Sequence, residues 1–308
     1  MRSCRYTYCR ADFNASLAAC PVCGYPVDDS DVQSTAAALK RMPGLPAGDI
    51  IDMHQIIPAQ TGMPGAQLKM MEKIGIQRAL LQSVPTKVSS ILGNKPLLAL
   101  RDAYPERFII SHFMDPRHPL AVKRLKQYRQ RGIRIIKLLP CLGYYPDEQR
   151  WDRFFRTMAS LGLSAMIHTG FITARHKNEE RRAGVFLHSK YGRPVFFDLL
   201  ARKYPEIQFV LCHMGGYLWT REAVEMVNHH ENVWGDVSGS GLQALKRIVN
   251  EKMPLTWSRV FWGNDSPPLM YPYNLRLLLH HLSQTDHPDL VRQLLYDNGQ
   301  RFISGYLS

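Results

Sequence analysis

The sequence predicts an α/β protein, a barrel of eight parallel strands surrounded by helices, preceded by a small cysteine-rich module. Two observations predict this. From about residue 48 onward, eight short apolar runs alternate with helix-like segments, the order that a (β/α)8 barrel needs over roughly 250 residues. Four of the six cysteines lie within the first 23 of 308 residues, and the composition is that of a globular protein, 45% hydrophobic and 21% charged.

The first cysteines have metal-ligand spacing. Cys4, Cys9, Cys20 and Cys23 form a C-x4-C-x10-C-x2-C pattern that ends in the knuckle "CPVCGYPV". Four thiolates make a closed tetrahedral zinc site, which supplies folding energy that so short a segment cannot obtain from a core. We predict a zinc-ribbon-like module over 1–30 with a structural Zn²⁺; an iron site or redox thiols are the alternatives.

A linker and a long domain follow the module. Pro and Gly at the end of residues 31–47 mark a boundary, and the barrel is predicted over 48–308. Several predicted strands are almost continuously apolar, as strands buried on both faces should be. The predicted strands are 49–54, 77–82, 107–113, 133–138, 164–168, 208–213, 233–236 and 260–263, and helix-like segments include 147–161, 194–204 and 219–230.

Four polar side chains fall at or just past the carboxyl ends of predicted strands, where a barrel holds its active site. They are His54, His168, His213 and Asp265. A single histidine at a strand end is usually a structural hydrogen-bonding residue. Three histidines and an aspartate at four strand ends instead favour a site that binds Zn²⁺ or Mn²⁺ and activates water.

Five segments carry a family resemblance. "IIDMHQI", "LSAMIHTG", "CHMGG", "NVWGDVSG" and "RVFWGNDSPP" follow one another along the chain. They resemble successive motifs of the amidohydrolase-related family, which includes aminocarboxymuconate semialdehyde decarboxylase, γ-resorcylate decarboxylase and lactone hydrolases. The resemblance implies a TIM barrel of the metal-dependent hydrolase type, and a homo-oligomer. It also implies His54 and His168 as ligands, Asp265 as a ligand or proton acceptor, and His213 as the residue that positions or deprotonates the activated water.

Ile56 departs from this pattern, because it stands where a second first-strand histidine is expected. Residues 52, 54 and 56 of a strand share one face. The interpretation that we favour is one divalent metal, Zn²⁺ or Mn²⁺, held by His54, His168 and Asp265, with His213 as fourth ligand or base. In a second interpretation Asp52 adds a carboxylate ligand. In a third the barrel binds no metal.

Other residues bear on the substrate. Family members often act on carboxylated aromatics or lactones. In the loop after the fifth strand, basic side chains would clamp an anionic small molecule, or simply form a solvated loop. The clamp candidates are Arg175, Lys177, His188 and Lys190. Cys141 is expected near the site and Cys212 is expected to point outward by alternation, both as buried small hydrophobes.

The net charge of +13 lies almost entirely in the long domain. Residues 117–137 hold eight Lys or Arg and no acidic residue. This pattern indicates a solvated helix face or a surface for an acidic protein partner. Aromatic residues are not interleaved as a nucleic-acid platform requires. No apolar run reaches the roughly 18–20 residues of a membrane span, and no secretory signal opens the chain, so we expect a cytoplasmic location.

Together these patterns predict a hydrolase or non-oxidative decarboxylase that acts on a small, carboxylated substrate through metal-activated water. The alternative is a catalytically altered or metal-free barrel that serves as a binding or scaffold protein through the zinc ribbon and the basic surface.

Overall fold

The computed structural model describes residues 1–6, 8–14, 16–27, 50–59, 65–85, 91–172, 181 and 184–307. The predicted linker, 31–47, and the last residues of the predicted module, 28–30, lie outside the described residues.

Eight parallel strands form a nearly closed barrel in simple sequential order, which confirms the predicted fold class. They are β3 (Ile50–Gln55), β4 (Ile76–Gln82), β5 (Phe108–Phe113), β6 (Ile135–Leu138), β7 (Ser164–His168), β8 (Phe209–Cys212), β9 (Val233–Asp236) and β10 (Val260–Phe261). The seam between the first and last strands is joined by the Met53 N–H bond to the Trp262 carbonyl, 3.1 Å, and by the Asp265 N–H bond to the His54 carbonyl, 2.7 Å. A glycine is needed at the seam, because a Cβ on Gly263 would lie 2.4 Å from the His54 Cβ.

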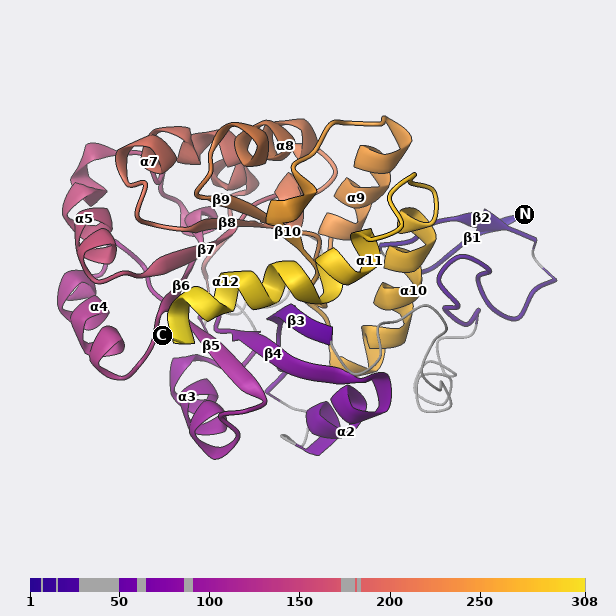
Figure 1. Cartoon of the computed structure of the whole chain (residues 1–308), viewed down its shortest axis with the longest axis horizontal. Coiled ribbons are helices and arrows are strands. Elements are labelled where there is room, and N and C mark those ends of the chain that lie inside the picture. Colours follow the sequence, from indigo (N-terminus) through magenta and orange to yellow (C-terminus); the bar gives the residue numbers. More distant parts are fainter. Residues whose placement is uncertain are drawn as a thin grey trace.

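Helices surround the barrel, as Figure 1 shows. They are α2 (Gly65–Ile74), α3 (Asn94–Ala103), α4 (Ala121–Gln130), α5 (Asp152–Ser160), α7 (Asp198–Lys203), α8 (Thr220–His229), α9 (Gly241–Asn250), α10 (Tyr271–Leu282), α11 (Leu290–Arg292) and α12 (Asn298–Leu307). Short 3₁₀ turns cover Pro140–Leu142, Gln149–Trp151, Ser189–Gly192, Pro194–Phe197, His213–Gly215, Trp257–Arg259 and Pro268–Met270, and a π turn covers Gln293–Asp297.

Helix α12 closes one end of the barrel. Figure 1 shows it lying across the strands. Phe302 packs edge-on against Trp234 and Phe261, with ring centroids 5.3 and 5.6 Å apart. These rings belong to the buried cluster inside the barrel that also contains Ile51 near the start of β3. Since this plug lies at the amino ends of the strands, the carboxyl ends are left to form the open mouth.

The cysteine-rich module packs against α10. Its two short strands, β1 (Arg2–Ser3) and β2 (Asp12–Phe13), form an antiparallel hairpin that Figure 1 shows beside α10. The rings of Tyr6 and Tyr25 stack with centroids 5.2 Å apart, and Tyr25 meets Tyr273 of α10 edge-on at the same distance. These aromatic contacts give a small module a buried face that it could not build alone.

The basic stretch forms helix α4 and strand β6, as its spacing predicts. Leu125 is buried on the inner side of the helix, while Lys123 and Lys126 are exposed. Lys137, at the end of the stretch, lies in β6 and is buried. The hypothesis of an acidic partner for the exposed lysines stays a prediction. Among the described residues, no helix has the length and apolar character to cross a membrane.

A buried histidine predicts that acid destabilises the fold. His112 in β5 is 3% exposed and packs edge-on against Tyr128, with ring centroids 4.8 Å apart. Burial, helped by the charge of Arg101, lowers the pKa of His112 to about 4. An unfolded histidine has a pKa of about 6.5, so between about pH 6.5 and 4 the unfolded chain binds a proton that the folded chain excludes. The free energy of unfolding therefore falls as pH falls through this window.

Between pH 7 and 5 the free energy of unfolding of the wild type should fall by about 2 kcal/mol more than that of His112→Phe. Urea unfolding of both proteins at several pH values measures the difference. His287→Gln changes an exposed histidine and serves as the control. Parallel pH curves for the wild type and His112→Phe would contradict the prediction.

Candidate metal centre

The four predicted site residues meet at the barrel mouth. His54 is in β3, His168 ends β7, His213 follows β8 and Asp265 follows β10. They line one small cavity of about 60 Å³. The described residues that line it are His54, Ile56, Val84, Ile91, Lys137, Leu139, Cys141, His168, Ile172, Leu187, His213 and Asp265. Ile56 therefore faces the site and offers it no donor, while Cys141 lies near the site as expected.

Three of these residues present metal-ligand atoms to one point. One donor atom from each of His54, His213 and Asp265 lies within 4.8 Å of the others, and all three residues are buried. His54 Nε2 is 3.7 Å from Asp265 Oδ1. A tetrahedral ion with bonds of about 2.1 Å places its donors about 3.4 Å apart, so the His54 and Asp265 pair fits a divalent metal after a shift of a few tenths of an ångström. The nearest donor atom of His213 lies within 4.8 Å of both.

His168 stands beside this group. Its ring centroid lies 5.0 Å from that of His213. The sequence predicted His168 as a ligand and His213 as the base, whereas the geometry places His213 inside the closest set of donors and His168 next to it. The division of roles between the two histidines stays a prediction.

Asp236 holds His54 from behind, and sequence reasoning did not assign it a role. Its Oδ2 lies 2.7 Å from His54 Nδ1, and its Oδ1 accepts the backbone N–H of His213 at 3.0 Å. Burial opposes its ionisation, yet the contacts with His54 hold the pKa of Asp236 well below its usual range. Burial and the charge of Lys137 lower the pKa of His54, but Asp236 outweighs them and raises it to about 10. This carboxylate fixes the ring so that Nε2 faces Asp265.

His213 is held as a neutral imidazole. Its Nδ1 lies 3.0 Å from the carbonyl oxygen of Ser238, which can only accept, so Nδ1 carries the proton and Nε2 keeps its lone pair. Burial lowers the pKa of His213 to about 4. Both His213 and Asp265 adopt left-handed backbone conformations, with φ of 66° and 42°. Such strain in non-glycine residues is typical of functional sites.

Asp52 lies outside the donor set. Its carboxylate accepts the Tyr271 hydroxyl at 2.5 Å and the backbone N–H groups of His54 and Asn264, each at 3.0 Å. It is therefore directed to α10, and burial raises its pKa to about 6. The expected alternation fails here because the pairing of β3 with β4 shifts register between Asp52 and Gln55. Asp52 stabilises the strand through these hydrogen bonds, and we do not propose it as a ligand.

Cys212 corrects a second expectation. Alternation along residues 208–213 predicted that it points outward, but it belongs to the cluster inside the barrel. The strand ends at Cys212, and the left-handed turn at His213 breaks the alternation. Its sulfur lies 3.1 Å from the buried ammonium of Lys137. Among the described residues this thiol is the only hydrogen-bond acceptor of Lys137, although an ammonium has three donors.

Lys137 and Asp236 were both visible as sequence signals. Lys137 is the one charge within the apolar run "IIKLL", and Asp236 ends a strand in "WGDVSG". A charged residue in a buried strand indicates a specific contact more strongly than its apolar neighbours do, because a buried charge needs a partner.

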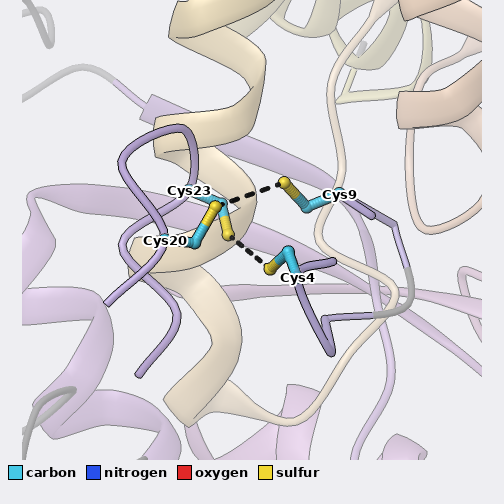
Figure 2. Close-up of side chains that lie close together, drawn as sticks. All are labelled: Cys4, Cys9, Cys20 and Cys23. Carbon is cyan, nitrogen blue, oxygen red and sulfur yellow. Dashed lines mark hydrogen bonds between the residues drawn. The ribbon is translucent and has the colours of Figure 1, made fainter. Parts of the chain in front are cut away.

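The four clustered cysteines match a tetrahedral zinc site. The Cys4 and Cys23 sulfurs are 3.6 Å apart, those of Cys9 and Cys20 are 3.8 Å apart, and all four lie within 4.8 Å. Figure 2 shows the four side chains converging from two loops. Zinc bonds of about 2.3 Å place sulfurs about 3.8 Å apart, whereas a disulfide needs about 2.05 Å. Hydrogen bonding, chiefly from Cys23, lowers the pKa of Cys9 to about 6, whereas burial raises the pKa of Cys4 to about 12 in the absence of an ion. The residues fit zinc, and this fit rests on the sulfur distances.

The predicted anion clamp is only partly described. Arg175 and Lys177 lie outside the described residues. His188 donates its backbone N–H to the Cys141 carbonyl at 2.7 Å, and the Lys190 ammonium lies 4.8 Å from the Tyr191 ring centroid. Neither side chain is among the described residues that line the metal cavity. Their substrate-binding role stays a prediction.

The sequence profile of the amidohydrolase family matches residues 71–304. The chain belongs to this family. No curated protein matches the sequence. Solved structures share the fold. An uncharacterised TIM-barrel protein from Bordetella bronchiseptica has a TM-score of 0.67 and 16% identity, covering 84% of this chain and 99% of its own.

Two further solved structures of similar fold are of a decarboxylase and of a probable hydrolase. A 5-carboxyvanillate decarboxylase from Novosphingobium aromaticivorans, in complex with manganese and 4-hydroxy-3-methoxy-5-nitrobenzoic acid, has a TM-score of 0.55 and 16% identity, covering 86% of this chain and 98% of its own. A probable 2-pyrone-4,6-dicarboxylic acid hydrolase from Acinetobacter baumannii, with citric acid bound, has a TM-score of 0.53 and 16% identity, covering 83% and 99%. At this identity the likeness shows the fold.

Proposed function

We propose that this protein is a metal-dependent hydrolase or non-oxidative decarboxylase that acts on a small carboxylated substrate. The observation that carries the proposal is the buried convergence of His54, His213 and Asp265 at the barrel mouth, with Asp236 behind His54. Both activities occur among the proteins of similar fold, and their bound ligands are carboxylic acids.

The proposed roles of His54, Asp265, Asp236 and His213 follow from their contacts, and that of His168 follows from the family resemblance. His54 and Asp265 hold the ion together with His168, and Asp236 keeps the His54 Nε2 directed at it. The ion supplies a Lewis acid and lowers the pKa of water. His213, neutral and with its Nε2 lone pair available, moves the proton. In hydrolysis it would take a proton from the attacking water, and in decarboxylation it would first take a proton from water onto Nε2 and then pass it to the carbon that loses carbon dioxide.

Lys137 is proposed to bind the substrate carboxylate. Its ammonium is buried in the cavity wall, and its hydrogen-bond acceptor among the described residues is the Cys212 thiol. An incoming carboxylate would therefore accept hydrogen bonds from donors that the protein leaves weakly bonded. The apolar neighbours Ile56 and Leu139 would keep water from competing for this contact. Because Ile56 stands where a histidine is expected, the site has one metal donor fewer, and the remaining residues carry out the chemistry.

Metal content per chain tests the proposal. We expect two ions in the wild type, one in His54→Ala, one in Cys20→Ser and none in the double variant, measured by elemental analysis after dialysis against trace zinc and manganese. The two single variants control for each other, because each removes a ligand from a different site. A wild type with one ion, lost in Cys20→Ser and kept in His54→Ala, would reject the barrel metal and favour the scaffold function, for which Ile56 in the cavity is the supporting observation.

A further inference from the structure

A second cavity lies between the barrel mouth and the cysteine-rich module. Its volume is about 620 Å³, against about 60 Å³ for the cavity around His54. This falls within the roughly 300–1,000 Å³ typical of ligand pockets. The two cavities are adjacent, since Ile172 lines both. We call the larger one the outer chamber. Its walls include Tyr6, Tyr8 and Arg10 of the module and Phe171, Ile172 and Tyr217 of the barrel.

The barrel wall of the outer chamber comes from the loops that carry the metal-site residues. Phe171 follows His168 in the same loop, and Tyr217 follows His213. Ser266, which also lines the chamber, is the residue after Asp265. The outer chamber is therefore the outward continuation of the site, on the side that the module covers.

The module wall is held firmly against the site. The Tyr6 hydroxyl donates to Asn274 Oδ1 on α10. Asn274 Nδ2 in turn donates to Asn264 Oδ1 at 2.8 Å, and Asn264 immediately precedes Asp265. All three residues are buried. A continuous hydrogen-bonded path thus fixes the module relative to the metal centre.

The chemistry of the outer chamber suits an aromatic anion. Phe171 and Tyr217 are 58% and 60% exposed, and so is the adjacent Leu218 at 57%, an apolar patch of the kind that marks a binding site. The Arg247 guanidinium lies 5.5 Å from the Tyr217 ring centroid and holds that ring in place. Arg10 is exposed and has no carboxylate partner among the residues that the structure describes. Aromatic faces beside a guanidinium recognise a flat ring that carries a carboxylate.

We propose that the outer chamber binds the distal, anionic end of the substrate, so that the cysteine-rich module selects the substrate. The inference rests on the proposed function, because the reacting end of the same molecule would lie in the metal cavity. It narrows the substrate class to an extended aryl diacid, with one carboxylate at the metal centre and a second near Arg10.

Calorimetric titration of the metal-loaded full chain with benzoate and with naphthalene-2,6-dicarboxylate tests this. We expect the dicarboxylate to bind more tightly than benzoate. Arg10→Gln should weaken dicarboxylate binding about 10-fold, because one charge-assisted contact is lost. It should weaken benzoate binding less than about twofold. Arg5→Gln changes a module arginine that does not line the chamber and should alter neither. Zinc content and circular dichroism confirm that both variants remain folded.

The outcomes separate this inference from the proposed function. If the dicarboxylate binds no better than benzoate, or equally well to Arg10→Gln, the chamber inference is wrong while benzoate binding still supports the metal site. If the dicarboxylate binds in an Arg10-dependent way and benzoate does not bind, the chamber stands and the proposed function is in doubt. A Phe171→Ala variant that changes the sedimentation coefficient and leaves dicarboxylate affinity intact would make this face a subunit contact and overturn the inference.

Discussion

Asp236→Asn is expected to weaken metal binding in the barrel by about 10- to 100-fold and to leave the four-cysteine ion in place. The carboxylate accepts a hydrogen bond from the His54 Nδ1–H at 2.7 Å, so Nε2 is the nitrogen that can give up its proton and ligate a metal. The asparagine amide can instead donate to Nδ1, which would move the ring proton to Nε2 and block the ligand atom. The loss of charge also removes much of the field that favours a cation in this buried site.

Competition with a chromophoric chelator measures the affinity of the barrel site in Asp236→Asn. The Asp297→Asn variant makes the same change at a half-exposed residue paired with Arg292, and should behave as wild type. Circular dichroism must show that Asp236→Asn is folded. An unchanged affinity in a folded variant would mean that Asp236 does not orient a ligand, and that His54 serves the fold.

Lys137→Met is expected to lower the affinity for an aryl carboxylate by about 10- to 100-fold without loss of metal, because a charge-assisted hydrogen bond in a buried site contributes about 1.5–3 kcal/mol. Methionine keeps most of the apolar stem and removes the ammonium. The fold should remain stable, since the variant also relieves the cost of burying a charge beside a thiol. A suitable probe is 4-hydroxy-3-methoxy-5-nitrobenzoate, whose nitrophenol absorbance reports binding.

Two comparisons make the Lys137 result specific. Lys123→Met removes an exposed ammonium on α4 and should leave probe affinity unchanged. A probe analogue without the carboxylate should bind the wild type and Lys137→Met alike. Should Lys137→Met lose metal as well as probe, the lysine would have a structural role in the centre and the proposed carboxylate contact would be wrong.

The barrel and its mouth could be predicted from the sequence because they depend on local patterns. Continuous apolar runs predicted the parallel strands, and two of them, 164–168 and 233–236, have the predicted bounds. Since parallel strands all end at one rim, their order alone brought His54, His168, His213 and Asp265 to one cavity. Cysteine spacing predicted the module cluster in the same way.

Only the tertiary structure decided which of these side chains touch and which way their neighbours point. The His54 contact with Asp236 joins residues 182 positions apart, and the Lys137 contact with Cys212 joins residues 75 apart. Neither pairing has a local pattern. The register shift beside Asp52 and the left-handed turn at His213 each overturned a strict alternation, because a one-residue irregularity reverses the face of a strand residue.

The position of the module is likewise a tertiary property. The cysteine spacing predicts that residues near the start of the chain come together in one cluster, but the position of that cluster on the barrel depends on the contacts of Tyr6 and Tyr25 with Tyr273 of α10. That place depends on packing between surfaces formed far apart in sequence, and it brings Arg10 to the rim of the metal cavity's outer chamber.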